Sequence, residues 1–221
     1  MKKIFLLLVL AISSSVFSQE KLTEGVVTSK MTLSSENEQM KAQFAMIGDI
    51  MSTTYFKNQM SRSESDNPMS GKQTVIIDND KKEMLMLMDN PMAGKMYMKQ
   101  NIEPSEEDLE GTTVTEGTET KKVLGYDCKQ YFIETEKDGN KAKIEFFVTD
   151  KLTAVSQQTA SFGDKIKGFP LYMKMDMTQM GMDMTMTYEV TEIKKESVAD
   201  DKFDMTPPEG YTEAQAGMGG N

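Results

Sequence analysis

The chain contains no histidine and no tryptophan, and it has one cysteine and one arginine. Without histidine, Ser-His-Asp and Cys-His catalytic groups, histidine zinc sites and the usual general base near neutral pH are excluded. The single cysteine, Cys128, excludes an intramolecular disulfide. We interpret Cys128 as a small buried apolar residue, with a reactive thiol as the alternative. These absences favour a protein that binds over one that catalyses: we predict no enzyme activity and no cofactor.

Long apolar runs are also scarce, and the one present lies at the N-terminus. Lys2 and Lys3 precede nine apolar residues, Ile4 to Ile12, and Val16-Phe17-Ser18 leads to Gln19. This pattern predicts a signal peptide over residues 1–18, and its apolar run is too short to span a bilayer. No cysteine lies near the cut, so the lipobox of a bacterial lipoprotein is missing. We expect an exported protein, periplasmic or secreted, with no transmembrane segment and no lipid anchor.

The sequence contains fewer basic than acidic residues. The formal net charge is −10, and it becomes −12 once residues 1–18, with two lysines and no acids, are removed. An anionic protein of this kind is a poor partner for nucleic acid or anionic lipid headgroups. The length suits a single antiparallel β domain over residues 19–206, followed by a flexible C-terminal tail over 207–221.

Short strands separated by turn residues fill most of the chain. We predict a strand over 21–33, two strands within 49–65 that bend near Lys57-Asn58, a hairpin over 72–89 turned at 78–80, and a strand over 94–100. The clearest hairpin covers 128–149, with Asp138-Gly139 in a type I′ turn. That turn pairs Tyr131 with Phe146, Ile133 with Ile144, Glu134 with Lys143, and Glu136 with Lys141. Opposite charges then lie on one face and apolar groups on the other.

Two segments interrupt this pattern. Residues 101–122 are acidic and rich in Thr and Gly, and we predict a solvated loop, with calcium binding as the alternative. Ser105 has the spacing to Asp108 of a capping box for a single helical turn. Residues 156–170 are the other irregular stretch, a lid or a crossover.

Methionine stands at nearly every second position of "MKMDMTQMGMDMTMTYE", Met173 to Glu189. A turn at Met180-Gly181 pairs Met177 with Met184, Met175 with Met186, and Met173 with Tyr188. Because side chains alternate along a strand, the methionines of both arms fall on one face and the polar residues on the other. The sequence therefore predicts a half-buried antiparallel hairpin with a thioether face.

A second set of methionines lies earlier in the chain. Met84, Met86 and Met88 alternate with Leu85 and Leu87, so we expect a strand that is covered on both faces in the middle of the sheet. Met96 and Met98 form a further pair. After residue 18 the chain has 21 methionines against 8 leucines and 9 isoleucines, which ordinary core packing does not require.

Several explanations of these methionines remain open. They can replace leucine and isoleucine as core filler, or they can form an adaptable concave surface for apolar ligands, since the unbranched thioether suits both uses. They can also bind Cu(I), which soft thioethers select; the candidate ligands are Met175, Met177, Met184 and Met186. A structural or interaction module of the cell envelope is a further alternative.

The stretch from Thr120 to Leu152 resembles a family of exported Gram-negative bacterial proteins that is labelled only as a domain of unknown function. The resemblance rests on Leu124-Gly125-Tyr126, Cys128, Tyr131, the Asp-Gly hairpin and Val148-Thr149, and on Phe169-Pro170-Leu171, "FDMTPPEGY" (203–211) and "YFKNQMSRSE" (55–64). That family is similar in architecture to the periplasmic lipoprotein carriers of the LolA and LolB type. The resemblance implies a mainly β fold: a curved antiparallel half-barrel whose concave face is covered by a few short helices or loops.

The resemblance also implies a role for Arg62, the one arginine. In the lipoprotein carriers an arginine at the cavity helps to hold the lid closed, and strand parity gives Arg62 the same side as Met60. The alternative is a surface arginine beside Glu64 and Asp66. We predict a non-enzymatic protein that holds a lipid or another apolar small molecule on a Met-rich concave face. The candidate binding residues are Arg62, Met84, Met86, Met88, Met96, Met98, Met173, Met175, Met177, Met184, Met186 and Tyr188.

Overall fold

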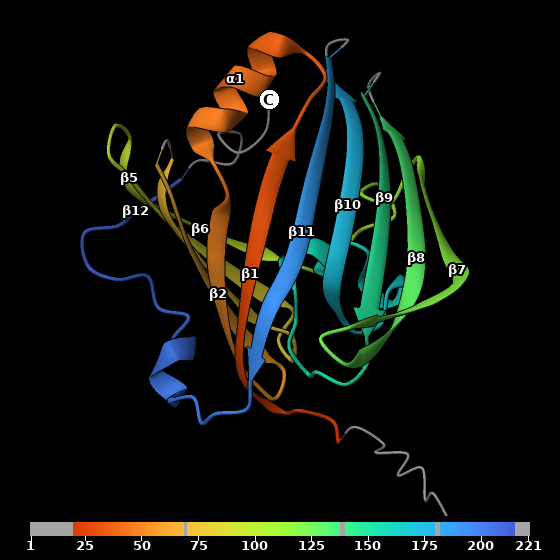
Figure 1. Ribbon diagram of the computed structural model, residues 1–221. Coiled ribbons are helices and arrows are strands. Elements are labelled where there is room, and N and C mark those ends of the chain that lie inside the picture. The colour runs from red at the N-terminus through yellow and green to blue at the C-terminus, as the bar shows by residue number, and fades with distance from the viewer. Residues whose placement is uncertain (1–19, 69, 138–139, 180–181, 215–221) are drawn as a thin grey trace, which may run out of the picture.

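Hairpins follow one another along the chain and join into one curved sheet (Figure 1). The structure is a computed structural model that describes residues 20–68, 70–137, 140–179 and 182–214. In chain order its elements are β1 (Glu24–Ser34), α1 (Glu38–Ile47), β2 (Ile50–Lys57), β3 (Met60–Asn67), β4 (Gly71–Asp78), β5 (Glu83–Asn90), β6 (Gly94–Asn101), β7 (Thr112–Val123), β8 (Tyr126–Lys137), β9 (Asn140–Thr149), α2 (Gln157–Ala160), η1 (Gly163–Lys165), β10 (Phe169–Gln179), β11 (Met182–Lys194), η2 (Asp200–Phe203) and β12 (Thr212–Glu213).

The sheet has 12 strands in the order β12-β6-β5-β4-β3-β2-β1-β11-β10-β9-β8-β7. Every pairing is antiparallel except that of β12 with β6. β12 and β7 stand at the two ends of this order, so the sheet is open and curved, as a half-barrel is. The predicted mainly β, curved sheet is confirmed.

The predicted registers are confirmed where the structure describes them. Met173 pairs with Tyr188, Met175 with Met186 and Met177 with Met184. In the other hairpin Ile133 pairs with Ile144, and the ion pairs Glu134–Lys143 and Glu136–Lys141 form at 3.1 Å and 3.0 Å. The bend predicted near Lys57-Asn58 is a turn in which Asn58 takes a left-handed φ of 54°. The turns predicted at Asp138-Gly139 and Met180-Gly181 lie outside the described residues.

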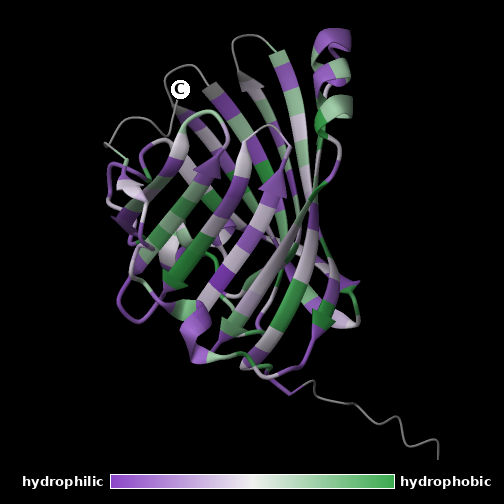
Figure 2. Ribbon diagram, turned by 90° about the vertical axis from the view of Figure 1, so that its left-hand side faces the viewer, coloured by the Kyte–Doolittle hydropathy of each residue, from purple (hydrophilic) through white to green (hydrophobic). Residues whose placement is uncertain are grey.

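Alternation along the strands separates two faces, visible as bands of green and purple in Figure 2. The lower part of the concave face is the main core. It carries fully buried side chains from strands far apart in the sequence, among them Val27, Phe56, Ile133, Phe146 and Met173. Residues 152–166, which include α2 and η1, pass across this part of the concave face and pack on it through Leu152, Ala154, Ile166 and Phe162. We call these residues the floor, since they close the lower half of the half-barrel. The irregular stretch 156–170 connects the neighbouring strands β9 and β10, so it is not a crossover, and its last two residues, Phe169 and Pro170, begin β10.

The C-terminal segment covers the opposite, convex face. Val198 and Phe203 pack with Val26 of β1, and Tyr55 and Met60 lie against them. Farther along, Met205 and Tyr211 pack against Ile76, Leu85 and Leu87. Strand β5 is therefore covered along its convex face at Leu85 and Leu87, but on its concave face only Met84 is buried, and Met86 and Met88 are half-exposed. The predicted cover of both faces is confirmed for the first part of the strand alone. The flexible tail expected from residue 207 falls partly on described residues: of these, 207–214 lie along the outer face and contribute β12.

Two elements differ from the prediction. Residues 112–122 are strand β7, paired with β8, and not a loop. The Ser105 capping box does form, since Ser105 Oγ accepts from the Asp108 amide at 3.2 Å and Asp108 Oδ2 accepts from the Ser105 amide at 2.9 Å. Helix α1 (Glu38–Ile47) was not predicted. Asn37 caps its N-terminus by accepting hydrogen bonds from the backbone amides of Gln39 and Met40, and Gly48, at φ 67°, ends the helix.

Candidate ligand-binding site

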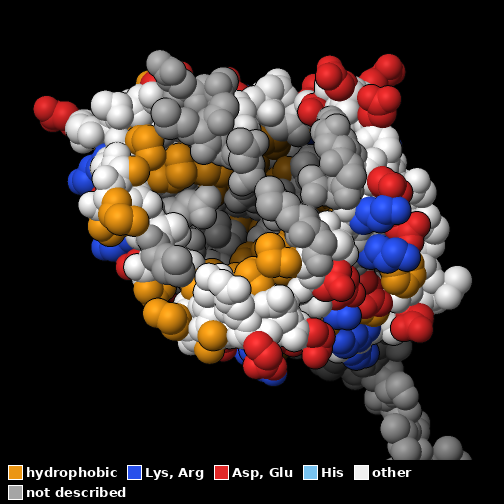
Figure 3. Space-filling view, turned by 90° about the horizontal axis from the view of Figure 1, so that it is seen from above, with side chains coloured by type: hydrophobic (Ala, Val, Ile, Leu, Met, Phe, Trp, Pro, Cys, Tyr) orange, Lys and Arg blue, Asp and Glu red, His pale blue; other side chains and the backbone are white. Residues whose placement is uncertain are grey.

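Above the floor the concave face is open, and Figure 3 shows a hollow in which hydrophobic side chains gather. Two groups of methionines line it. Wall one, on β5 and β6, joins Met86 to Met98 and Met88 to Met96 across the strands. Wall two, on β10 and β11, joins Met175 to Met186 and Met177 to Met184. All eight side chains are half-buried, so they line the hollow without being closed off from it.

Three of the predicted site residues lie below the hollow. Met84 is 3% exposed and Met173 is 2% exposed, and both belong to the core. Tyr188 is equally buried, and this burial raises the pKa of its phenol to about 12, against a hydrogen bond with Ser29 that lowers it. These side chains lie below the wall methionines and do not line the hollow itself.

Arg62 lies on the other side of the sheet, which corrects its implied role at the cavity. Strand parity does put it on the side of Met60, but that side is the convex one, under η2. Its guanidinium contacts Glu64 at 2.5 Å and donates to the carbonyl of Lys202 at 3.2 Å. Arg62 therefore fastens the C-terminal segment to the outer face.

Between the two walls runs a set of hydroxyl groups that the prediction missed. We call it the hydroxyl stripe; it consists of Ser29, Ser52, Thr54, Ser61, Ser63 and Ser65 on β1, β2 and β3. Ser29 bonds to Ser52 at 2.7 Å, Thr54 donates to Ser63 at 3.2 Å, and Ser61 accepts from the Val155 amide of the floor at 2.7 Å. The alternation Ser61-x-Ser63-x-Ser65 is the sequence signal that could have revealed it.

The stripe meets a small cavity and wall one. A cavity of about 30 Å³ lies between the stripe and the floor, bordered by Ser63, Ser156 and Tyr188 among others. On β4, which lies next to β3, the side-chain amide of Gln73 donates a hydrogen bond to the sulfur of Met86 at 3.4 Å. Polar and thioether side chains therefore share one continuous surface.

Charge is absent from this surface. On β1 to β6 and β9 to β11, none of the described concave-face positions carries Asp, Glu, Lys or Arg. The intervening convex positions carry many, including Lys30, Glu64, Lys72, Lys174 and Asp176. These strand positions thus offer apolar contact and neutral hydrogen bonds to the hollow, and none of them offers an acid, a base or a counter-ion.

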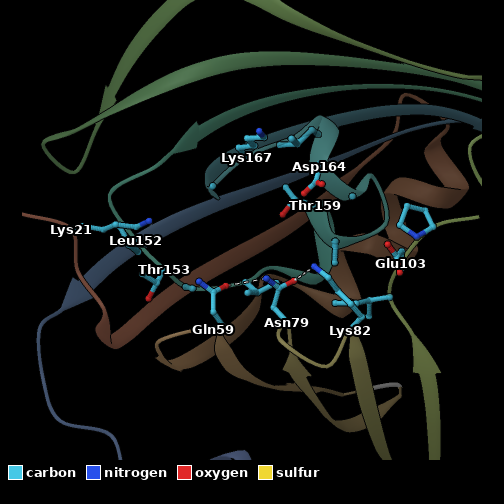
Figure 4. Close-up of a pocket in the computed structure, with 18 residues that line it drawn as sticks. Lys21, Gln59, Asn79, Lys82, Glu103, Leu152, Thr153, Thr159, Asp164 and Lys167 are labelled. Atoms are coloured by element: carbon cyan, nitrogen blue, oxygen red, sulfur yellow. Dashed lines mark hydrogen bonds between the residues drawn. The ribbon is translucent and has the colours of Figure 1, made fainter.

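Two further cavities flank the floor. One of about 510 Å³ opens between β6 and the β7–β8 edge, lined by Met84, Ile102, Leu109 and Phe162 with Thr112 and Thr135. This volume is within the range of small-molecule sites. The other, of about 290 Å³, lies at the far end from the hollow (Figure 4). It is polar, and its Lys82, Asn79 and Gln59 are already joined in a chain of hydrogen bonds of 3.2 Å and 3.0 Å.

Cys128 is buried, and burial raises the pKa of its thiol to about 11. A thiol held protonated in this way is a poor nucleophile, which fits the interpretation as a core residue. No helix among the described residues is long and apolar enough to cross a membrane. The same residues contain no group of three or more His, Cys, Asp or Glu side chains able to hold a metal ion.

The comparison with solved structures gave several similar chains. PNGF-II, in C2 and P21 crystals, aligns at a TM-score of 0.49 with 18% and 16% identity, over 87% of this chain and 31% of that chain. This chain therefore spans about a third of PNGF-II. MucB, in complex with MucA(peri), aligns at 0.40 with 9% identity over 84% of this chain and 56% of that one. The Mycobacterium tuberculosis lipoprotein LppX aligns at 0.31 with 6% identity over 80% and 89%.

All four TM-scores are below 0.5, so our description of the fold rests on the strand pairing of this chain alone. No curated protein sequence matches it. A protein-family model matches residues 24–211, from β1 to the C-terminal segment. This match agrees with the resemblance seen in the sequence. The chain belongs to the family described as domain of unknown function (DUF4412).

Proposed function

We propose that the protein binds an apolar, lipid-like ligand in the hollow above the floor. The observation that carries this proposal is the half-exposure of eight methionines that converge from two walls on a concave surface, whose described positions on β1 to β6 and β9 to β11 carry no charge. Apolar side chains that stay accessible in a concavity are typical of ligand sites, and flexible thioethers adapt to ligands of variable shape. The described concave-face positions of β1 to β6 and β9 to β11 supply no carboxylate, amine or imidazole, which supports binding without catalysis.

Native mass spectrometry of the protein purified from its own host tests this function, because a bound ligand adds its mass. We expect a co-purifying lipid or acyl species and enhanced fluorescence of a hydrophobic dye. An empty protein that also leaves the dye unchanged would overturn the proposal.

A matched pair of variants locates the site. Met98→Lys puts a charge on wall one, whereas Met51→Lys puts the same charge on the convex face, where Met51 is 48% exposed. We expect Met98→Lys to abolish dye and lipid binding and Met51→Lys to leave both unchanged, with similar melting temperatures. Equal binding by the two variants would mean that the ligand binds outside the hollow.

Binding of Cu(I) is a second candidate, favoured by one observation. The register of β10 and β11 brings the four wall-two methionines together as two adjacent cross-strand pairs, and thioethers select Cu(I). A competition assay with a Cu(I) chelator, under reducing conditions, separates this candidate from lipid binding: no transfer of Cu(I) to the wild type would exclude it.

We also propose that the protein works outside the cytoplasm after cleavage between Ser18 and Gln19. The support is the basic and then apolar pattern of residues 1–18. N-terminal sequencing of the protein from the periplasmic and secreted fractions should begin at Gln19; a chain that still begins at Met1 would contradict this proposal.

A further inference from the structure

The lining of the hollow is not uniformly apolar. The two methionine walls stand on either side of the hydroxyl stripe, which crosses the concave face on β1, β2 and β3. A purely hydrocarbon ligand would leave these hydroxyls facing apolar groups, which costs free energy whenever a hydroxyl loses its bond to water without a replacement. The pattern therefore suits a ligand with apolar parts on both sides of a polar centre.

The stripe has hydrogen-bonding capacity to offer such a centre. A serine hydroxyl has one proton and two acceptor positions. Ser63 accepts from Thr54, which leaves its own proton for a further acceptor. No hydrogen bond within the described part of the chain involves the hydroxyl of Ser65, and this side chain is half-exposed. The cavity of about 30 Å³ beside Ser63 has room for a small polar group or a water.

The lack of charged side chains at these concave-face positions limits which polar group the ligand can carry at its centre. Among the described concave-face positions of β1 to β6 and β9 to β11 there is no Lys or Arg to pair with a phosphate and no Asp or Glu to pair with an amine. An ionised group taken into such a surface loses its hydration without gaining a partner. A neutral ester, hydroxyl or amide loses far less and gains hydrogen bonds from serine.

Resting on the proposed function, we infer that the hollow selects an uncharged amphiphile. Its neutral centre, of the glycerol-ester kind, lies on the hydroxyl stripe at Ser63 and Ser65, and its apolar chains lie against the two methionine walls. A phosphorylated or ionised lipid with the same chains is discriminated against, because its head group must stay in water at the rim.

Three probes with the full exported chain test this inference by displacement of a hydrophobic dye: dioleoylglycerol, dioleoyl phosphatidic acid and the hydrocarbon squalene. We expect dioleoylglycerol to bind about tenfold more tightly than either of the others, since each net hydrogen bond is worth up to about tenfold. Equal affinities, or tighter binding of the phosphatidic acid, would overturn the inference and leave apolar binding itself intact. Binding of none of the three would overturn the proposed function instead.

Variants of the stripe supply the second readout. Ser63→Ala/Ser65→Ala should lower the affinity for dioleoylglycerol about tenfold, to the squalene level, and should leave squalene binding unchanged. Thr53→Ala, on the convex face of the same sheet, is the matched control and should change neither. If the double variant does not fold, Ser65→Ala alone replaces it, because the Ser65 hydroxyl makes no hydrogen bond within the described chain. Unchanged selectivity in the folded variant would contradict the role of the stripe.

Discussion

The lower and upper halves of the concave face are built from the same strands and the same residue type, yet they behave differently. Met173 and Met175 are two positions apart on β10 and point to the same side, but Met173 is buried in the core and Met175 is half-exposed. Met84 and Met86 on β5 differ in the same way. The difference comes from the floor, which covers the lower rows only. Methionine therefore serves here both as core filler and as an accessible concave surface, and the cover provided by the floor decides which.

The largest expected effect separates the two halves by a buried charge. Met173→Asp places an unpaired carboxylate in the core, and we expect it to lower the free energy of unfolding by at least about 4 kcal/mol or to prevent folding. Met177→Asp, on wall two, keeps access to water and should cost about 1 kcal/mol or less. Urea denaturation measures both, and losses of equal size would mean that the floor does not separate the halves.

The second-largest expected effect is a loss of folding stability at alkaline pH, which arises in the lower half. The pKa of Tyr188 is about 12 in the folded protein and about 10 in the unfolded chain, so the folded state holds the phenolic proton more tightly. This contribution is complete below pH 10 and is lost as the pH rises from 10 to 12, by roughly 3 kcal/mol. Tyr188→Phe should remove that part of the pH dependence. Parallel stability curves for the wild type and the variant, measured by urea denaturation at pH 8 to 12, would contradict it.

A smaller effect concerns the hydrogen bond that fastens the floor to the stripe. Ser61 is buried and accepts from the Val155 amide, so Ser61→Ala leaves that amide unpaired and should cost about 1–3 kcal/mol. Ser65→Ala, four residues along β3 on the same face, should cost less than about 0.5 kcal/mol. Thermal melts of the two variants decide whether the lower half depends on this contact.

The smallest effect is expected in the upper half. Replacing Met175, Met177, Met184 and Met186 with leucine keeps volume and hydrophobicity nearly constant, and each swap should change stability by less than about 1.5 kcal/mol. Lipid binding should persist, because leucine is equally apolar. Any Cu(I) affinity of the wild type that survived this replacement would place the metal away from wall two.

Much of the fold follows from local patterns. Period-2 alternation and turn residues predicted both hairpins and their registers, since cross-strand partners are fixed once the turn is placed. Alternation also sorted Met175, Met177, Met184 and Met186 to one face. The acidic composition of the whole stretch 101–122 and the few apolar residues of 112–122 concealed strand β7, because a strand at the edge of a sheet, largely exposed, needs few apolar residues.

The site itself was only partly predictable. Parity tells which residues share a face, but it does not tell which face is concave, because that depends on contacts between distant segments. Arg62 shows this: its parity with Met60 was correct, yet both lie under η2 on the convex face. The depth of Met84 and Met173 depends likewise on the floor. Helix α1 has no buried residue, so it lacks the strong apolar stripe by which a helix is found in a sequence.

The thioether lining gives the hollow a chemical sensitivity that a leucine lining would lack. Oxidants convert methionine to its sulfoxide, which is polar and chiral. The wall methionines, open to solvent, are accessible to such reagents, whereas Met84 and Met173 are shielded by the core. Oxidation would therefore turn the walls polar while leaving the lower core intact, and the protein would lose its apolar surface before it lost its fold. Enzymatic reduction of the sulfoxides would restore that surface, since this step of the methionine oxidation ladder is reversible.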